Sequence, residues 1–171
     1  RDFCLSRGLG DVYKRQRFAL SIGKVIEVQG INSEIVGGEH ILMWEFDITD
    51  LSLVTTALRH QQRIHNLPDI TIARSHPGGG FHAYCFKRLP WLKSLSIVAD
   101  TEGVDPGYVN MCAWRMKFTL RLTDKGQGAP QFLAMLSGDL HPDCSMLDLS
   151  SHVKYEAHTT KKIWRFGLTE R

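Results

Sequence analysis

The sequence lacks several features that would assign its class at once. No apolar run in its 171 residues approaches the roughly 18 residues that a membrane-spanning helix needs, and no stretch has the pattern of a secretory signal. An excess of one charge is also missing, because the formal net charge at pH 7 is only +3, which permits a polyanionic partner without requiring one. We therefore expect a globular protein with no membrane partner.

Cysteine is sparse as well. Of the four cysteines, Cys4 falls in residues 1–16, where Asp11-Val12-Tyr13-Lys14-Arg15-Gln16 matches the translation of a transposon-end adaptor used in shotgun sequencing. We expect residues 1–16 to be this artefact of a metagenome-derived chain, with the natural N-terminus missing; the alternative is a polar N-terminal arm. The other three cysteines are Cys85, Cys112 and Cys144. Their odd number and wide spacing disfavour a disulfide framework and indicate a reducing, cytoplasmic compartment.

The remaining residues, 17–171, are predicted to form one domain, since 43% apolar and 23% charged residues are ordinary for a globular protein. Apolar spacing predicts a helix at 51–65, begun by Asp50 or Ser52 and ended by Asn66 and Pro68. The other expected elements are antiparallel strands at 24–28 and 40–48, a hairpin of 71–74 and 81–86, helices at 91–99 and 129–136, a long strand at 109–122, and a mixed pattern at 147–166. This order predicts an α+β fold in which helices pack on one face of an antiparallel sheet.

Two acids lie at the end of the apolar strand at 40–48. Alternation places Glu45 and Asp47 on one face, where neighbouring negative charges repel each other. A hard cation such as Mg²⁺ or Mn²⁺ between the two carboxylates would relieve this repulsion. The alternative is a strand end that has reached solvent, with both acids hydrated.

Two further patterns carry candidate chemistry. The hairpin link at 75–80 is rich in glycine and leads into a strand on which His82 shares a face with Tyr84. The expected strand at 109–122 has several cations on one face, an anion-binding stripe or a solvated outer face: Arg115, Lys117 and Arg121.

A zinc site is disfavoured. Its ligands would have to come from a His-x2-Cys-x7-His-x5-His spacing near the C-terminus, in which no Cys-x-x-Cys pair occurs: His141, Cys144, His152 and His158.

The combination of an acid pair, a glycine-rich hairpin with a histidine, and an acid before a basic segment resembles the catalytic core of the archaeo-eukaryotic primase superfamily, the primase–polymerases of phages and plasmids. The first motif of that family is similar to residues 42–47, with Glu45 in place of the usual first aspartate. The second is similar to residues 75–82. The third, a single acid before a strand with arginine and lysine, is similar to the segment from Asp105 to Lys125. The resemblance covers residues 40–125.

The resemblance implies an RRM- or ferredoxin-like sheet and a two-metal nucleotidyltransferase, a DNA primase or polymerase, in a bacterial or phage-infected cell. Metal would be held by Glu45, Asp47 and Asp105, with Asp100 or Glu102 as alternatives for the third acid. His82 would act beside the metals on the triphosphate. The implied phosphate-binding residues are Ser75, Gly79, Gly80, Arg115, Arg121 and Lys125. The implied partners are a single-stranded DNA template, nucleoside triphosphates and a replicative helicase.

Two other functions compete with this interpretation. A non-catalytic domain that binds single-stranded nucleic acid would present exposed aromatic side chains where Glu45, Asp47 and His82 lie. A rolling-circle replication initiator would need two histidines flanking one apolar residue, and no His-x-His occurs in the sequence.

Overall fold

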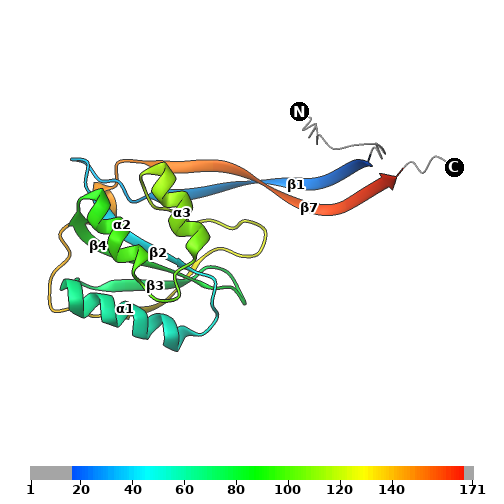
Figure 1. Ribbon diagram of the computed structural model, residues 1–171. Helices are drawn as coiled ribbons and strands as arrows, with labels where there is room; N and C mark the ends of the chain where they lie inside the picture. Colours follow the sequence, from blue (N-terminus) through cyan, green and yellow to red (C-terminus); the bar gives the residue numbers. More distant parts are fainter. Residues whose placement is uncertain (1–16, 168–171) are drawn as a thin grey trace, which may run out of the picture. The chain divides into compact units, whose positions relative to one another are not determined.

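The computed structural model describes the backbone of residues 17–167 and the side chains of residues 25–157 (Figure 1). The suspected adaptor at residues 1–16, and the side chain of His158, lie outside the described residues. The chain divides into two units, one of residues 26–157 and one of residues 1–25 with residues 158–171. All side chains discussed below belong to the unit of residues 26–157. None of the helices within residues 17–167 is long and apolar enough to cross a membrane.

A four-stranded antiparallel sheet forms the centre of this unit. Its strand order is β2 (His40–Phe46), β4 (Phe81–Leu89), β3 (Ile70–Arg74) and β6 (Gln131–Leu136). The β3–β4 hairpin confirms the hairpin prediction, with Ala73 opposite His82. In the β2–β4 pair, Glu45 lies directly opposite His82. The α+β class with an antiparallel sheet is therefore confirmed.

The predicted partner of β2 was wrong. Residues 24–28 belong to β1 (Arg17–Asn32), which lies between β5 (Thr119–Arg121) and β7 (His152–Gly167) in a second sheet. The turn after β1 reverses the chain direction, with Gly37 and Gly38 at positive φ angles and the Ile35 N–H bonded to the Glu39 carbonyl at 2.9 Å. Long-range pairing decides the difference, because residues 30–32 of β1 pair with β5 whereas β2 pairs with β4.

Within residues 17–167, three α-helices accompany the sheets, and two of them were predicted. Helix α1 (Leu51–His65) begins at Asp50, whose carboxylate accepts a 2.8 Å bond from the Ser52 N–H, and ends at Asn66 in the left-handed conformation. Helix α2 (Trp91–Ala99) follows Pro90. Both predictions, at 51–65 and 91–99, are confirmed.

The predicted long strand at 109–122 was wrong, because its first half belongs to helix α3 (Pro106–Arg115) and only residues 119–121, in β5, are a strand. The Asp105 carboxylate accepts 2.9 Å bonds from the N–H groups of Gly107 and Tyr108, and Pro106 occupies the first turn. Met116, in the left-handed conformation, ends the helix before β5. Arg115, Lys117 and Arg121 therefore do not share one strand face.

The C-terminal predictions also need correction. Residues 129–136 were predicted to be helical, but 131–136 form β6, because pairing with β3 decides the structure of a short apolar run that suits either element. The mixed segment at 147–166 contains a short 3₁₀ helix, η1 (Met146–Asp148), and then β7.

The outer edge of β2 is covered by the segment that leads into α3. The Asp105 N–H donates to the Glu45 carbonyl at 2.8 Å, and the Tyr108 hydroxyl donates to the Met43 carbonyl at 3.3 Å. These bonds use the carbonyls that an edge strand would otherwise expose. On β2 itself, the indole of Trp44 is fully buried and donates to the Thr101 hydroxyl at 2.8 Å, which connects the strand to the end of α2. The end of β2 is thus fixed from two directions.

Candidate active site

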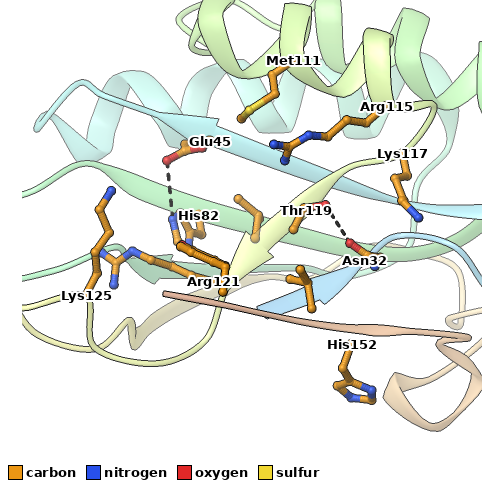
Figure 2. Close-up of a pocket in the computed structure, with 13 residues that line it drawn as sticks. Asn32, Glu45, His82, Met111, Arg115, Lys117, Thr119, Arg121, Lys125 and His152 are labelled. Atoms are coloured by element: carbon orange, nitrogen blue, oxygen red, sulfur yellow. Dashed lines mark hydrogen bonds and ion pairs between the residues drawn. The ribbon is translucent and has the colours of Figure 1, made fainter. Parts of the chain in front are cut away.

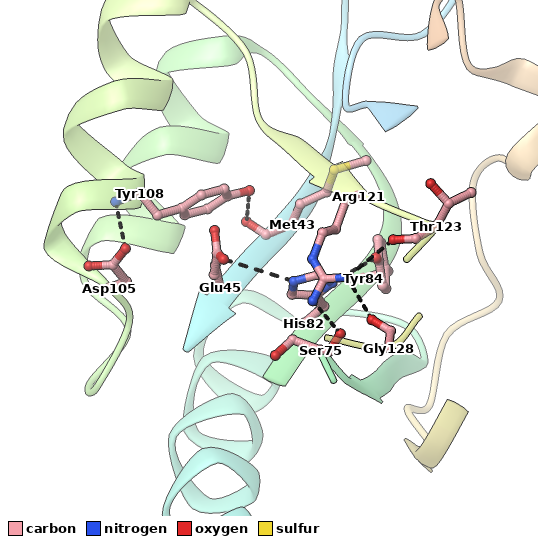
Figure 3. A network of polar contacts seen from close by, with 10 residues as sticks. All are labelled: Met43, Glu45, Ser75, His82, Tyr84, Asp105, Tyr108, Arg121, Thr123 and Gly128. Carbon is pink, nitrogen blue, oxygen red and sulfur yellow. Dashed lines mark hydrogen bonds and ion pairs between the residues drawn. The ribbon is translucent and has the colours of Figure 1, made fainter. Parts of the chain in front are cut away.

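Glu45 and His82 form the centre of the candidate site, on neighbouring strands. The Nε2 atom of His82 lies 3.9 Å from Oε1 of Glu45, and its Nδ1 atom lies 3.5 Å from the Tyr84 hydroxyl (Figure 3). His82 is 1% exposed, whereas the Glu45 side chain is 35% exposed. The carboxylate therefore reaches solvent while the imidazole is enclosed.

His82 is neutral at pH 7. Burial, with the positive charges of Arg121 and His76, lowers the pKa of His82 to about 4. The contact with Glu45 is therefore a polar contact and not an ion pair at neutral pH. In the tautomer that accepts from the Tyr84 hydroxyl on Nδ1, the proton lies on Nε2, which at 3.9 Å from Glu45 is too distant for a hydrogen bond to that carboxylate.

We expect this histidine to make the metal-free protein less stable in acid. The unfolded chain takes up a proton near the ordinary pKa of 6.5, whereas folded His82 does so only near 4, so stability is lost as the pH falls through this window. At about pH 5 the loss should be about 2 kcal/mol relative to neutral pH. Urea unfolding of wild type and His82→Asn at both pH values isolates this contribution, and equal pH dependence in the two proteins would contradict it.

Arg121, at the end of β5, is held beside the histidine by backbone carbonyls. Its guanidinium donates to the carbonyls of Thr123 and Gly128, each at 3.1 Å, and to that of Ser75 (Figure 3). No described acidic side chain forms an ion pair with it. Arg121 therefore connects the Ser75 turn to the loop at 122–128. Its positive charge is not paired with a described carboxylate and is available to bind an anionic ligand.

A cavity of about 690 Å³ opens beside this network, and its charged lining is mainly positive (Figure 2). Glu45 and His82 line it. The cationic lining comes from the end of α3, from β5 and from the loops beside them: Arg115, Lys117, Arg121 and Lys125. The predicted cations are thus brought together with the predicted acid and histidine, although not by the strand face that the sequence suggested. Such a cavity suits a ligand that carries several negative charges.

The two other predicted acids lie outside the cavity lining but close to Glu45. Asp47 is exposed and follows the last residue of β2, and the Asp105 carboxylate caps α3. Burial, and then the negative charges of Asp47 and Asp105, raise the pKa of Glu45. The three carboxylates are therefore donors of the chemical type that a hard divalent cation prefers. Among the described side chains, however, no three His, Cys, Asp or Glu residues are grouped closely enough to hold a metal.

The glycine turn before His82 is packed against the end of β2. A Cβ atom on Gly80 would overlap the Phe46 carbonyl oxygen and would lie 3.0 Å from the Cα atom of Asp47. A Cβ atom on Gly79 would overlap the His76 ring. The Ser75 N–H closes the turn with a 2.9 Å bond to the Gly80 carbonyl. These glycines therefore allow the two strand ends that carry Glu45 and His82 to meet.

Several cavity residues were not predicted as site residues. Asn32, at the end of β1, had been given no role, and Met111 had been placed on the expected strand at 109–122. His152 had been considered only for zinc, and it lies on the cavity wall. The Asp105-Pro106 pair is a helix-start signal that could have placed Met111 and Arg115 on the helix that lines the cavity.

Comparisons with protein-family models, curated proteins and solved structures find no match to this chain.

Proposed function

We propose that this protein is a metal-dependent nucleotidyltransferase of the primase–polymerase type, which adds nucleotides to a strand on a single-stranded template. The observation that carries the proposal is the Glu45–His82 pair at the edge of a cavity with four cations, with Asp47 and Asp105 close enough to raise the pKa of Glu45. Nucleotidyl transfer needs both halves of this arrangement, acids for metal and cations for phosphate.

The acids would hold the metal. Glu45 and Asp47 would be the protein ligands, and the Asp105 carboxylate, which also caps α3, would complete the negative site. Divalent cations held there would supply activation of the attacking 3′ hydroxyl and stabilisation of the leaving pyrophosphate. The Asp105–Glu45 backbone bond at 2.8 Å keeps the third acid beside the first.

The cations and the histidine would hold the triphosphate. Arg121 is oriented by three carbonyls and has no acidic partner among the described residues, so its charge is preorganised for phosphate. Lys125 lines the same cavity, on the loop that Arg121 fastens. Neutral His82, with a proton on Nε2, would donate a hydrogen bond without adding a further positive charge that repels the metal.

The proposal is tested by incorporation of labelled nucleotides on a primed single-stranded template. Incorporation should require Mg²⁺ or Mn²⁺ and stop on chelation, and both ribo- and deoxynucleotides should be supplied because the site is argued from phosphate and metal alone. Wild-type protein that binds the template but incorporates nothing with either metal would contradict the proposal.

We expect His82→Ala to raise KM for the nucleotide as well as to lower kcat, because the imidazole would contact the triphosphate. Loss of one hydrogen bond to a charged group should reduce kcat/KM about 10- to 100-fold. His141→Ala is the matched control, since His141 is exposed and does not line the cavity. A fall in kcat with KM unchanged would show that His82 does not hold the nucleotide.

A non-catalytic domain that binds single strands is the second candidate, because the cationic cavity suits any polyanion. It explains the cations but gives no reason for the acids beside them. The two candidates are separated by Asp47→Ala, which should weaken incorporation in an enzyme and should strengthen or leave unchanged the binding of a strand.

A further inference from the structure

Trp114, on the last turn of α3, is unusually exposed. Its side chain is 84% exposed, whereas the other described tryptophans, Trp44 and Trp91, are buried. Large aromatic side chains are mostly buried in globular proteins, and exposed ones are characteristic of binding surfaces.

Trp114 stands beside the cavity of the candidate active site. It follows Met111 by three residues on the helix, so the two side chains are neighbours, and it precedes Arg115 directly. Met111 and Arg115 line the cavity, as does Lys117 after the helix end (Figure 2). Met111 is 42% exposed. An apolar surface of Met111 and Trp114 therefore borders the cationic cavity wall.

Charge indicates what this surface binds. Arg115 forms no ion pair with a described residue, and Lys117 forms one with Glu34, at 3.8 Å and near the surface, where such a pair is weak. A ligand that suits both the exposed indole and the neighbouring cations has flat rings that stack on the indole and negative charges at intervals along its length. Single-stranded nucleic acid has this chemistry, and indole stacking is indifferent to base identity.

We propose that the single-stranded template passes over the C-terminal end of α3, with a base stacked on Trp114 and its phosphates next to Arg115 and Lys117. That the bound strand serves as a template rests on the proposed function, but strand binding itself does not require catalysis. The end of α3 would guide the strand towards Glu45 and His82.

The test is fluorescence anisotropy of a labelled oligothymidylate with the full chain and no divalent metal. Trp114→Ala should weaken binding about 5- to 150-fold, the effect of losing one stacked base, and Trp114→Phe should restore most of it. Leu92→Ala is the control, because Leu92 is 74% exposed on α2 and does not line the cavity, and it should bind as wild type does. Equal binding by wild type and Trp114→Ala would overturn the proposal.

Salt dependence separates stacking from charge. Trp114→Ala should lower affinity with the slope of log K against log salt unchanged, whereas Arg115→Gln should reduce that slope by about 1. If Trp114→Ala instead abolishes self-association in sedimentation and leaves strand binding intact, the surface binds protein and the proposal fails. Strand binding that depends on Trp114 in a protein without incorporation would uphold this inference and contradict only the proposed enzyme.

Discussion

Asp47→Ala should lower metal-dependent incorporation by about 100-fold or more, because it removes a carboxylate that would hold the catalytic cations. The fold should be unaffected, since Asp47 is exposed and follows the last residue of β2. In the absence of metal the variant should be as stable as wild type or slightly more stable, because the negative charge of Asp47 raises the pKa of Glu45 and its removal relieves that repulsion. Incorporation kinetics and thermal unfolding check the two parts separately.

Asp50→Ala is the matched control for this variant. Asp50 is also exposed, but its carboxylate caps α1 through 2.8 Å bonds to the N–H and the hydroxyl of Ser52. Its loss should cost about 1 kcal/mol of stability and leave incorporation close to that of wild type. Asp47→Ala should therefore lower activity without lowering stability, whereas Asp50→Ala should lower stability without lowering activity. Incorporation that survives Asp47→Ala would place the chemistry elsewhere in the chain.

Gly80→Ala should destabilise the protein and inactivate it. The new methyl group would overlap the Phe46 carbonyl oxygen, a backbone atom that cannot rotate away, so the end of β2 and the start of β4 would have to separate. Such overpacking should cost about 3 kcal/mol or more. Because Glu45 and His82 lie opposite each other on these strands, the same displacement would separate them. Urea unfolding and the incorporation assay measure the two effects.

Gly78→Ala, in the same turn, distinguishes crowding from backbone strain. Gly78 has a φ of +73° and no atom within 4 Å of the position that a Cβ would occupy. The substitution should therefore cost only about 1–2 kcal/mol, the strain of a left-handed alanine, and should leave incorporation intact. Equal stability losses in the two variants would contradict the close approach of the turn to β2.

Local signals in the sequence were sufficient for some elements. Helix α1 has its cap at Asp50 and its left-handed end at Asn66, and the glycines between β3 and β4 indicated their hairpin. The opposition of Glu45 and His82 depends on a register between β2 and β4 that no local pattern specifies, although both residues had been selected as candidates. What the sequence supplied was the type of residue and not the distance between residues.

Long-range pairing decided the elements that were predicted wrongly. Residues 131–136 are apolar enough for a helix, and only the free edge of β3 makes them a strand. In the segment at 109–122, alternating apolar residues favoured a strand, whereas the cap at Asp105 and the proline after it begin a helix. The residues that line the cavity come from distant parts of the chain, among them Asn32, Glu45, Arg115 and Lys125. Their proximity could therefore be predicted only from the fold.

Template copying with nucleoside triphosphates by this site can be measured in a single primer-extension experiment. A primer on a homopolymeric single-stranded template is incubated with wild-type protein, Mn²⁺ and each of the four nucleotides in separate reactions. We expect extension with the complementary nucleotide alone and release of one pyrophosphate for each residue added. Equal extension with all four nucleotides, or a template that is bound and never copied, would contradict it.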